Sequence, residues 1–229
     1  MFYHPEDLFD LKQTDHHLLF DGVEYPWDPL KRLADYIRTH LQPIQRHRAV
    51  GQVYIDANVF IGEGTVVEHG ATILGPAIIG KNCQIRHNAY LRENVVLGDN
   101  CVVGNACEVK NSILFNNAQV PHFNYVGDSI LGYKAHLGAG AVLSNIKLAP
   151  ENVWVEMDGR CIDSGLRKFG SLVGDNTDIG CNSVLNPGSI IGRGAMLYPN
   201  LSWRGILPGN MIAKNRAAQD ITIRRPRHD

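Results

Sequence analysis

Residues 61–108 read IGEGTV, VEHGAT, ILGPAI, IGKNCQ, IRHNAY, LRENVV, LGDNCV and VGNACE when the sequence is divided into groups of six. Each group begins with an aliphatic residue, and a small residue usually follows four places later. Repeats in which each unit is one short strand plus a turn predict a parallel β-helix with one continuous stacked core. The period is held without a break at ten positions: Ile55, Ile61, Val67, Ile73, Ile79, Ile85, Leu91, Leu97, Val103 and Val109.

Two interruptions divide the later part of this repeat. The first is PHFNY at residues 121–125, and the six-residue spacing resumes at Leu131. The second covers about residues 149–169, and the spacing returns from Val173 onwards. We therefore expect an all-β domain over residues 47–202, with both interruptions as loops outside the stacked core.

The segments on either side lack the repeat. Residues 1–46 are charged and aromatic, and we expect them to form an N-terminal helical appendage. Asp28 and Pro29 are a capping residue and a first-turn proline, and Pro43 is a stop signal. They predict one amphipathic helix over about residues 29–41, with apolar residues at helical spacing: Leu30, Leu33, Ile37 and Leu41. Residues 203–229 are expected to be a C-terminal tail.

Composition excludes several classes of protein. The chain has 229 residues, 44% hydrophobic content and a net charge of -1, which is enough apolar material for one long domain. The absence of a basic block before the terminal RRPRH run argues against a nucleic-acid partner. Five cysteines without a C-x-x-C pair, and no apolar N-terminal region, predict a reduced cytoplasmic protein. An apolar run of about 20 residues, the length that spans a bilayer, is also missing.

Four short motifs carry a resemblance. They are VKNSI at residues 109–113, PHFNYVGD at 121–128, GAG at 138–140 and SN at 144–145. With the repeat, they resemble the left-handed β-helix acyltransferases, in particular the glucosamine-1-phosphate N-acetyltransferase domain of bifunctional enzymes of UDP-N-acetylglucosamine synthesis. Related archaeal sugar-1-phosphate nucleotidyltransferases carry the same domain. The resemblance covers about residues 50–200.

The resemblance implies several properties that the repeat by itself does not. It implies a left-handed coil, against the usual right-handed preference for parallel crossovers. It implies a homotrimer whose active sites lie between neighbouring prisms. It also implies acetyl-CoA as cosubstrate and an amino-sugar phosphate as acceptor.

His122 matches the general base of that family, which accepts a proton from the sugar amine as the amine attacks the thioester. A histidine suits this role because its unperturbed pKa lies near working pH. The alternative is that His122 is a loop histidine that only forms hydrogen bonds with the backbone. Tyr125 matches a sugar-binding tyrosine, and the alternative is an aromatic ring packed under the loop.

Arg92 and Lys110 match the cations that hold the sugar phosphate. They lie eighteen residues apart, which is one full coil of three hexapeptides, so they should stack on one face. Two such cations would repel each other unless an anion lay between them, and this favours a phosphate site over a solvated face. Lys168, at the end of the second interruption, matches a third substrate lysine.

Gly138, Ala139, Gly140 and Asn145 match the strip that binds acetyl-CoA, with Cys181 on the same side. Glycines let a cofactor approach the backbone, and exposed amides can polarise a thioester oxygen. The alternative is an ordinary β-helix turn, which also favours glycine.

Some residues depart from the bacterial pattern. His136 stands where that enzyme has an asparagine that contacts the sugar, Ile146 replaces a tyrosine, and Cys181 replaces a serine. The lysines that the archaeal proteins carry after the asparagine fall near Glu151 and Trp154 here, so that contact is lost or moved. The GRCIDSGLRKFG segment at residues 159–170 looks more like the archaeal branch, which accepts more than one amino-sugar phosphate.

Other polar residues give weaker indications of function. His69 and His87 would stack like a metal pair, as in γ-class carbonic anhydrases of this fold, but the required H-x-x-x-x-H pair is missing, so we expect no metal. The neighbouring histidines at 16 and 17 are expected to be a solvated surface pair. Cys83 and Cys101 share a face and are expected to be buried core thiols.

Two functions remain open. The first is an acetyl-CoA-dependent N-acetyltransferase acting on an amino-sugar 1-phosphate, glucosamine-1-phosphate above all, with His122 as base. The second is a non-catalytic trimeric scaffold or regulatory domain that binds sugar phosphate. Nucleotidyl transfer is set aside because some 50 residues before the prism are too few for the complete α/β domain it needs.

Overall fold

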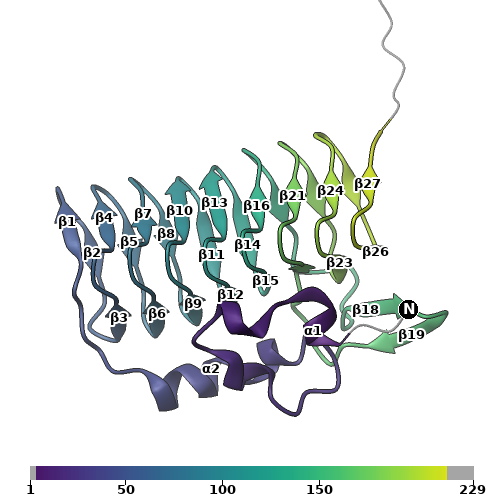
Figure 1. The fold of residues 1–229 in the computed structure, drawn as a ribbon, viewed down its shortest axis with the longest axis horizontal. Coiled ribbons are helices and arrows are strands. Elements are labelled where there is room, and N and C mark those ends of the chain that lie inside the picture. The colour runs from purple at the N-terminus through teal and green to yellow at the C-terminus, as the bar shows by residue number, and fades with distance from the viewer. Residues whose placement is uncertain (1–3, 216–229) are drawn as a thin grey trace, which may run out of the picture.

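The computed structural model describes residues 4–215, which form a prism of three long parallel sheets. Figure 1 shows the coils side by side along the longest axis of the molecule. The coil is left-handed, as the resemblance implies, and each turn contributes one strand to each sheet. The sheets are called face one, face two and face three in the order in which the chain visits them.

Face one contains nine strands in the hydrogen-bonded order β1 (Arg48–Val50), β4 (Val66–Glu68), β7 (Gln84–Ile85), β10 (Val102–Asn105), β13 (Gln119–His122), β16 (His136–Leu137), β21 (Asp178–Ile179), β24 (Met196–Leu197) and β27 (Ile212–Ala213). Face two contains eight, in the order β2 (Tyr54–Ile55), β5 (Thr72–Ile73), β8 (Tyr90–Leu91), β11 (Glu108–Lys110), β14 (Tyr125–Gly127), β17 (Val142–Leu143), β22 (Val184–Leu185) and β25 (Ser202–Trp203). Face three contains eight, in the order β3 (Val59–Ile61), β6 (Ala77–Ile79), β9 (Val95–Leu97), β12 (Ser112–Leu114), β15 (Ile130–Leu131), β20 (Ser171–Val173), β23 (Ser189–Ile191) and β26 (Ile206–Leu207).

The interior of the prism is the aliphatic stack that the repeat predicts. Ile55 is partly buried at the open end, and the other nine predicted positions are fully buried. Cys83 and Cys101 lie inside the same core, so the prediction of buried thiols is confirmed. Burial of this continuous column is the main favourable term for a fold whose strands are too short to be stable singly.

The first interruption is not a loop outside the core, and that expectation was wrong. Residues 119–122 and 125–127 are strands β13 and β14, and the core residues Val120 and Val126 are fully buried. The irregularity lies in two five-residue steps, from Val109 to Leu114 and from Val126 to Leu131, where the chain turns after β11 and β14. Asn111 and Asp128 take left-handed backbone angles in these two turns, with φ of 44° and 49°. The coil therefore shortens without losing its stacking.

The N-terminal segment covers face three. Helix α2 (Pro29–His40) confirms the predicted helix to within one residue, and α1 (Pro5–Leu8) and the 3₁₀ turns η1 (Leu11–Gln13) and η2 (His17–Phe20) precede it. Asp28 does not cap α2, contrary to our expectation. Its own backbone is already helical, and its side chain accepts the Tyr25 N–H at 2.8 Å and pairs with Lys31 at 2.8 Å.

A second apolar core lies between this segment and the prism. Trp27 is fully buried, stacks on Tyr25 with ring centroids 4.8 Å apart, and lies 5.8 Å from the ring of Phe169. Face three presents an outward row of buried aliphatic residues to it: Ile78, Val96, Ile113, Ile130, Leu172 and Ile190. Face three is thus buried on both sides.

The second interruption is an excursion, as expected. It forms the antiparallel hairpin of β18 (Trp154–Met157) and β19 (Arg160–Asp163), which leaves the prism between β17 and β20. Val153, Val155 and Met157 join the second apolar core. The hairpin and the N-terminal segment together leave faces one and two uncovered (Figure 1).

The coil continues beyond residue 202, where we expected the tail to begin. Strands β25, β26 and β27 extend all three faces to Ala213. The basic run at residues 224–227 lies outside the described residues. Within residues 4–215, no helix is both long enough and apolar enough to cross a membrane.

Candidate active site

His122 ends strand β13 at the corner between faces one and two. Asn124 fixes this corner because it is buried, its side-chain NH₂ donates to the Gly138 carbonyl at 2.7 Å, and its oxygen accepts the His122 N–H at 3.0 Å. The His122 carbonyl accepts the Gly140 N–H at 3.0 Å. The backbone is thus held on both sides while the imidazole is exposed. A fixed backbone with an exposed imidazole suits proton transfer to a bound substrate.

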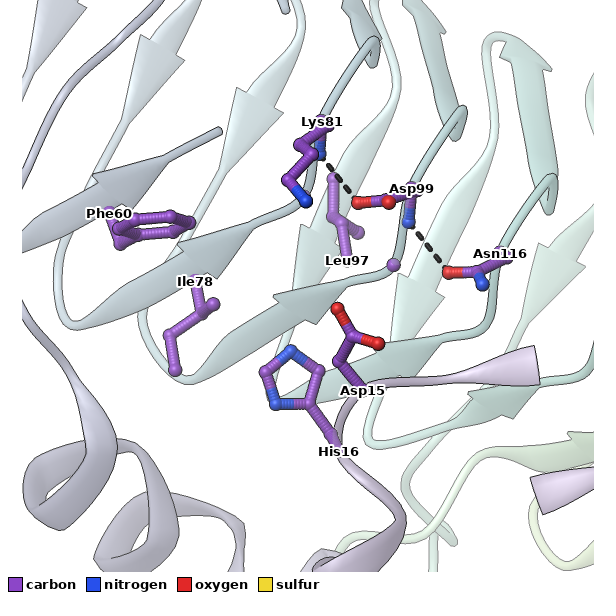
Figure 2. A pocket seen from close by; sticks show the side chains of 10 residues that line it. Asp15, His16, Phe60, Ile78, Lys81, Leu97, Asp99 and Asn116 are labelled. Carbon is purple, nitrogen blue, oxygen red and sulfur yellow. Dashed lines mark hydrogen bonds between the residues drawn. The ribbon is translucent and has the colours of Figure 1, made fainter. Parts of the chain in front are cut away.

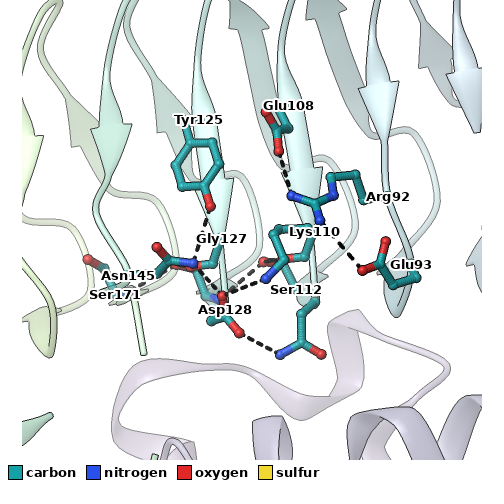
Figure 3. A network of polar contacts seen from close by, with 12 residues as sticks. Arg92, Glu93, Glu108, Lys110, Ser112, Tyr125, Gly127, Asp128, Asn145 and Ser171 are labelled. Atoms are coloured by element: carbon teal, nitrogen blue, oxygen red, sulfur yellow. Dashed lines mark hydrogen bonds and ion pairs between the residues drawn. The ribbon is translucent and has the colours of Figure 1, made fainter. Parts of the chain in front are cut away.

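Tyr125 starts the next strand, on face two. Its hydroxyl accepts a hydrogen bond from Asn145 Nδ2 at 3.2 Å, and the same nitrogen donates to Asp128 Oδ2 at 2.5 Å (Figure 3). Burial raises the pKa of Tyr125, and the charges of Glu108 and Asp128 raise it further. The phenol therefore stays neutral and can act as a hydrogen-bond donor to a ligand.

Asp128 is the centre of the polar network and was not singled out from the sequence. It is buried, and its carboxylate accepts from Lys110 Nζ at 3.3 Å and from Asn111 Nδ2 at 2.8 Å, besides Asn145. The Lys110 side chain is only 10% exposed. This is a nearly buried ion pair whose carboxylate accepts three hydrogen bonds, and a buried carboxylate requires such partners.

Arg92 lies one coil away from Lys110 and has acidic partners of its own. Its guanidinium donates to Glu108 at 3.1 Å and lies 3.7 Å from Glu93. The hydrogen bond to Glu108 raises the pKa of Arg92. The inference that two bare cations need an anion between them was therefore wrong, because three carboxylates already supply the negative charge.

Lys168 reaches the same edge from the excursion. Residues 146 and 168 pair in an isolated bridge, and the Phe169 N–H donates to the Asn145 carbonyl at 2.9 Å. Lys168 itself is exposed. The structure thus brings Arg92, Lys110, Tyr125, Asn145 and Lys168 to one side of the prism.

A groove of about 340 Å³ lies on face one and has largely apolar walls. It crosses strands β16, β21 and β24, next to the strand that ends at His122. Its lining includes His136, Gly138, Asp178, Cys181, Met196 and Tyr198.

Gly138, which lines this groove, and Gly140 in the same turn have a structural reason to be glycines. A Cβ on Gly138 would lie 2.6 Å from the Cys181 nitrogen of the next coil. Gly140 has φ of 73°, and a Cβ there would meet Asn182 Oδ1 at 2.4 Å. The tight stacking of coils explains both positions, so any role with a cofactor rests on the groove and not on the glycines.

His136 lies in the groove and not beside Tyr125. It pairs in register with Asp178, and its Nδ1 is 3.6 Å from the Asp178 carboxylate. If His136 contacts the sugar, as predicted, the sugar must reach it from face one. Cys181 is exposed on the same wall.

A second cavity, of about 270 Å³, lies between the N-terminal segment and the corner that joins faces three and one. Figure 2 shows Asp15 and His16 facing Lys81 and Asp99 across an apolar floor. His16 bonds the Tyr36 hydroxyl at 2.9 Å, and burial lowers the pKa of His16. The expectation that residues 16 and 17 form a solvated pair was wrong for His16.

The histidines considered for metal have other partners. His69 Nδ1 accepts the Gln52 N–H at 3.2 Å, while His87 Nε2 lies 2.8 Å from the side chain of Asn105. In the part of the chain that the structure describes, no three His, Cys, Asp or Glu side chains are grouped to hold a metal ion.

Comparisons with known proteins agree with this architecture. The family described as GMPPB C-terminal domain matches residues 73–166. The chain is 33% identical over 181 residues to the bifunctional protein GlmU of Methanococcus maripaludis, covering 79% of this chain and 44% of that protein. It is 36% identical over 88 residues to a bifunctional sugar-1-phosphate nucleotidylyltransferase/acetyltransferase of Sulfurisphaera tokodaii, covering 38% of this chain and 22% of that protein.

A solved structure shows the same fold. The UDP-N-acetylglucosamine acyltransferase of Francisella novicida superposes with a TM-score of 0.51 at 15% identity, covering 72% of this chain and 64% of that one. The chain spans less than half the length of the two curated relatives above. The solved structure shows that the chain has the fold of a hexapeptide-repeat acyltransferase, and the relatives show that it is similar to part of the bifunctional sugar-1-phosphate enzymes.

Proposed function

We propose that the chain transfers an acetyl group from acetyl-CoA to the amine of an amino-sugar 1-phosphate, with glucosamine-1-phosphate as the first choice. The observation that carries this is the position of His122 between two unlike surfaces. On one side is the polar network of face two, suited to a sugar phosphate, and on the other is the apolar groove of face one. A base at that corner lies where an acceptor amine and a thioester can meet.

The reaction needs no covalent enzyme intermediate. The amine nitrogen attacks the thioester carbonyl carbon, the new C–N bond forms, and His122 accepts the proton that the nitrogen must lose. Collapse of the tetrahedral adduct breaks the C–S bond, and the coenzyme A thiolate leaves and takes up a proton. In the turn at residues 138–140, the Gly138 and Gly140 N–H groups already donate to the Ile179 and His122 carbonyls, so the Ala139 N–H is the candidate for stabilising the oxyanion.

The acceptor would be held by Tyr125, Lys110, Arg92 and Lys168. Asn145, which the resemblance assigns to the acetyl-CoA strip, would act with the acceptor site because its side chain bonds Tyr125 and Asp128. A phosphate that approaches Arg92 competes with Glu108, which is about one-third exposed and can swing aside, whereas Asp128 is buried and stays with Lys110. Asp128 would therefore orient Lys110 and Asn145 while the more exposed cations contact the phosphate. Charge-assisted hydrogen bonds of this kind are the stronger ones.

A homotrimer is part of the proposal. The corner that carries His122 and the half-open network of face two both lie on uncovered surfaces, and a neighbouring prism would close the site by cyclic symmetry. If light scattering showed a monomer and that monomer had full transferase activity, this arrangement would be contradicted.

The alternative is a trimeric scaffold that binds sugar phosphate without turnover. The ion pair between Lys110 and Asp128 favours this alternative, because it leaves Lys110 already paired. It is also favoured by three residues that differ from those of the resembled enzyme: His136, Ile146 and Cys181.

Release of free thiol from acetyl-CoA separates the two. The acceptors would be glucosamine-1-phosphate, galactosamine-1-phosphate, a 4-amino-sugar phosphate and unphosphorylated glucosamine. Turnover with a phosphorylated acceptor and little with glucosamine supports the transferase and its phosphate contacts. A ligand present at a hundred times its Kd stabilises the folded protein by about 2.7 kcal/mol, which a thermal shift would detect. If no acceptor is turned over and acetyl-CoA gives no thermal shift, the non-catalytic scaffold is the function supported.

A further inference from the structure

The cavity of about 270 Å³ beneath the N-terminal segment continues beside helix α2. A second hollow of about 190 Å³ adjoins it, because His16, Phe60 and Ile78 line both. Phe60 and Ile78 are paired in register on β3 and β6, in the outward apolar row of face three, and Leu97 extends this floor. The N-terminal segment therefore leaves one section of its apolar contact with face three unfilled.

Three charged side chains, those of Asp15, Lys81 and Asp99, face this floor (Figure 2). One oxygen of the Asp99 carboxylate accepts the backbone N–H of Lys81 at 2.7 Å, which fixes the carboxylate between two coils. Among the residues that the structure describes, the other oxygen of Asp99, the Asp15 carboxylate and the Lys81 ammonium have no hydrogen bond or ion pair. Two carboxylates and one ammonium are thus open to the cavity.

His16 adds a hydrogen-bonding group without a charge. Its Nδ1 bonds the Tyr36 hydroxyl at 2.9 Å, and Tyr36 stacks on His40 with ring centroids 4.1 Å apart. Burial lowers the pKa of His16, so the imidazole is neutral near pH 7. In the described part of the chain, Nε2 of His16 has no hydrogen-bond partner. The N-terminal wall of the cavity therefore offers a carboxylate and a neutral ring nitrogen.

These groups select a class of ligand. An ammonium group that lies between two carboxylates is attracted by both and relieves their mutual repulsion. Lys81 favours an anion at the same rim, and the floor favours an apolar body. A phosphate with two negative charges fits poorly, because a single ammonium would have to outweigh two carboxylates. A carboxylate has one charge, which matches Lys81.

We propose that this cavity binds a free α-amino acid with a large apolar side chain, such as phenylalanine or leucine. The ammonium group of the ligand would lie between Asp15 and Asp99, its carboxylate would pair with Lys81, and its side chain would lie on the apolar floor. The ligand would join the N-terminal segment to the prism. The cavity lies at the corner of faces three and one, whereas His122 lies at the corner of faces one and two, so this inference does not depend on the proposed function.

Calorimetry with small probes tests the class of ligand. Phenylalanine should bind the wild type. Phenethylamine, 3-phenylpropionate and glycine lack the carboxylate, the amine and the apolar side chain in turn, and each should bind at least about tenfold more weakly. Glucosamine-1-phosphate, which has an amine and a phosphate, should not displace phenylalanine. A thermal shift with phenylalanine gives a second measurement, since a ligand of the folded protein stabilises it.

Three variants test the charged groups. Asp15→Asn and Asp99→Asn remove a charge at constant size, and the oxygen of Asp99→Asn can still accept the Lys81 N–H. Each should weaken the binding of phenylalanine about tenfold. Lys81→Gln should abolish the advantage of phenylalanine over phenethylamine. Asp21→Asn is the matched control, because Asp21 belongs to the same segment, is exposed and does not line the cavity, so binding should not change.

Three results would overturn this assignment. The first is that phenylalanine and leucine neither bind nor shift the melting temperature at millimolar concentration. The second is that Asp15→Asn and Asp99→Asn bind phenylalanine as tightly as the wild type. The third is that phenethylamine binds as tightly as phenylalanine, or that glucosamine-1-phosphate displaces it. Each result concerns binding alone, so the proposed acetyl transfer stands or fails separately.

Discussion

Face three and the corner between faces one and two are built from the same repeat but are used in opposite ways. The residue just before each core position of face three is apolar from Phe60 to Ile206, and this outward row is buried under the N-terminal segment and the hairpin. At the same positions of faces one and two stand residues such as His136, Asp178, Glu108 and Tyr125. One face of the prism therefore serves stability, and the opposite corner remains free for chemistry.

The largest expected effect on stability is at the covered face. Trp27→Ala should destabilise the protein by about 3–5 kcal/mol, because it removes a fully buried indole from between Tyr25 and Phe169. Urea unfolding measures this. Phe123→Ala, at the open corner with 62% exposure, is the matched control and should change stability little.

A smaller loss is expected in the polar network. Asp128→Asn keeps the size of the side chain but removes the counter-ion of the nearly buried Lys110. Breaking such a pair costs about 3 kcal/mol, the low end of the usual range, because the amide retains part of the hydrogen bonding. It should also lower transferase activity, since Lys110 and Asn145 lose their common acceptor. A variant as stable as the wild type would show that Asp128 does not carry the network.

Arg92→Ala should cost stability about 1 kcal/mol or less, because its pair with Glu108 is one-third exposed. We expect it to weaken binding of the amino-sugar phosphate and to leave coenzyme A binding unchanged. Calorimetry with each ligand checks this. Equal loss of both ligands would remove Arg92 from the acceptor site.

The smallest expected effect depends on pH. Burial lowers the pKa of His16 in the folded protein, so the unfolded chain takes up a proton first as the pH falls below about 6.5, and stability falls with it. His16→Gln can keep a contact with Tyr36 and should reduce this loss. Unfolding curves of both proteins between neutral and mildly acidic pH provide the measurement. Parallel curves would show that His16 is not the group responsible.

The repeat was sufficient to predict the prism because burial fixes one aliphatic residue in each strand. It did not reveal the two five-residue steps, since the change of spacing between Val109 and Leu131 was assigned to one loop at residues 121–125, although a turn can lose one residue and keep the stack. The outward apolar row of face three was visible in the sequence, one residue before every third core position. It would have predicted a face covered by another segment.

The polar network was harder to predict. Lys110 and Asp128 are eighteen residues apart, and Asp128 and Asn145 are seventeen, so the spacing of one coil places them together. We applied that spacing to the cations, to the histidines at 69 and 87 and to the cysteines at 83 and 101, but we missed the carboxylate partners of the cations. The separation of His136 from Tyr125 also follows from the faces, because residue 136 belongs to face one and residue 125 to face two.

The most direct test of the central claim is the comparison of kcat and KM between the wild type and His122→Ala with glucosamine-1-phosphate and acetyl-CoA. A positioned base contributes about 10²- to 10⁴-fold, so kcat should fall by that factor while KM changes only a few-fold. The fold should be unaffected because the imidazole is exposed. A His122→Ala protein with kcat within two- to threefold of the wild type would contradict the account.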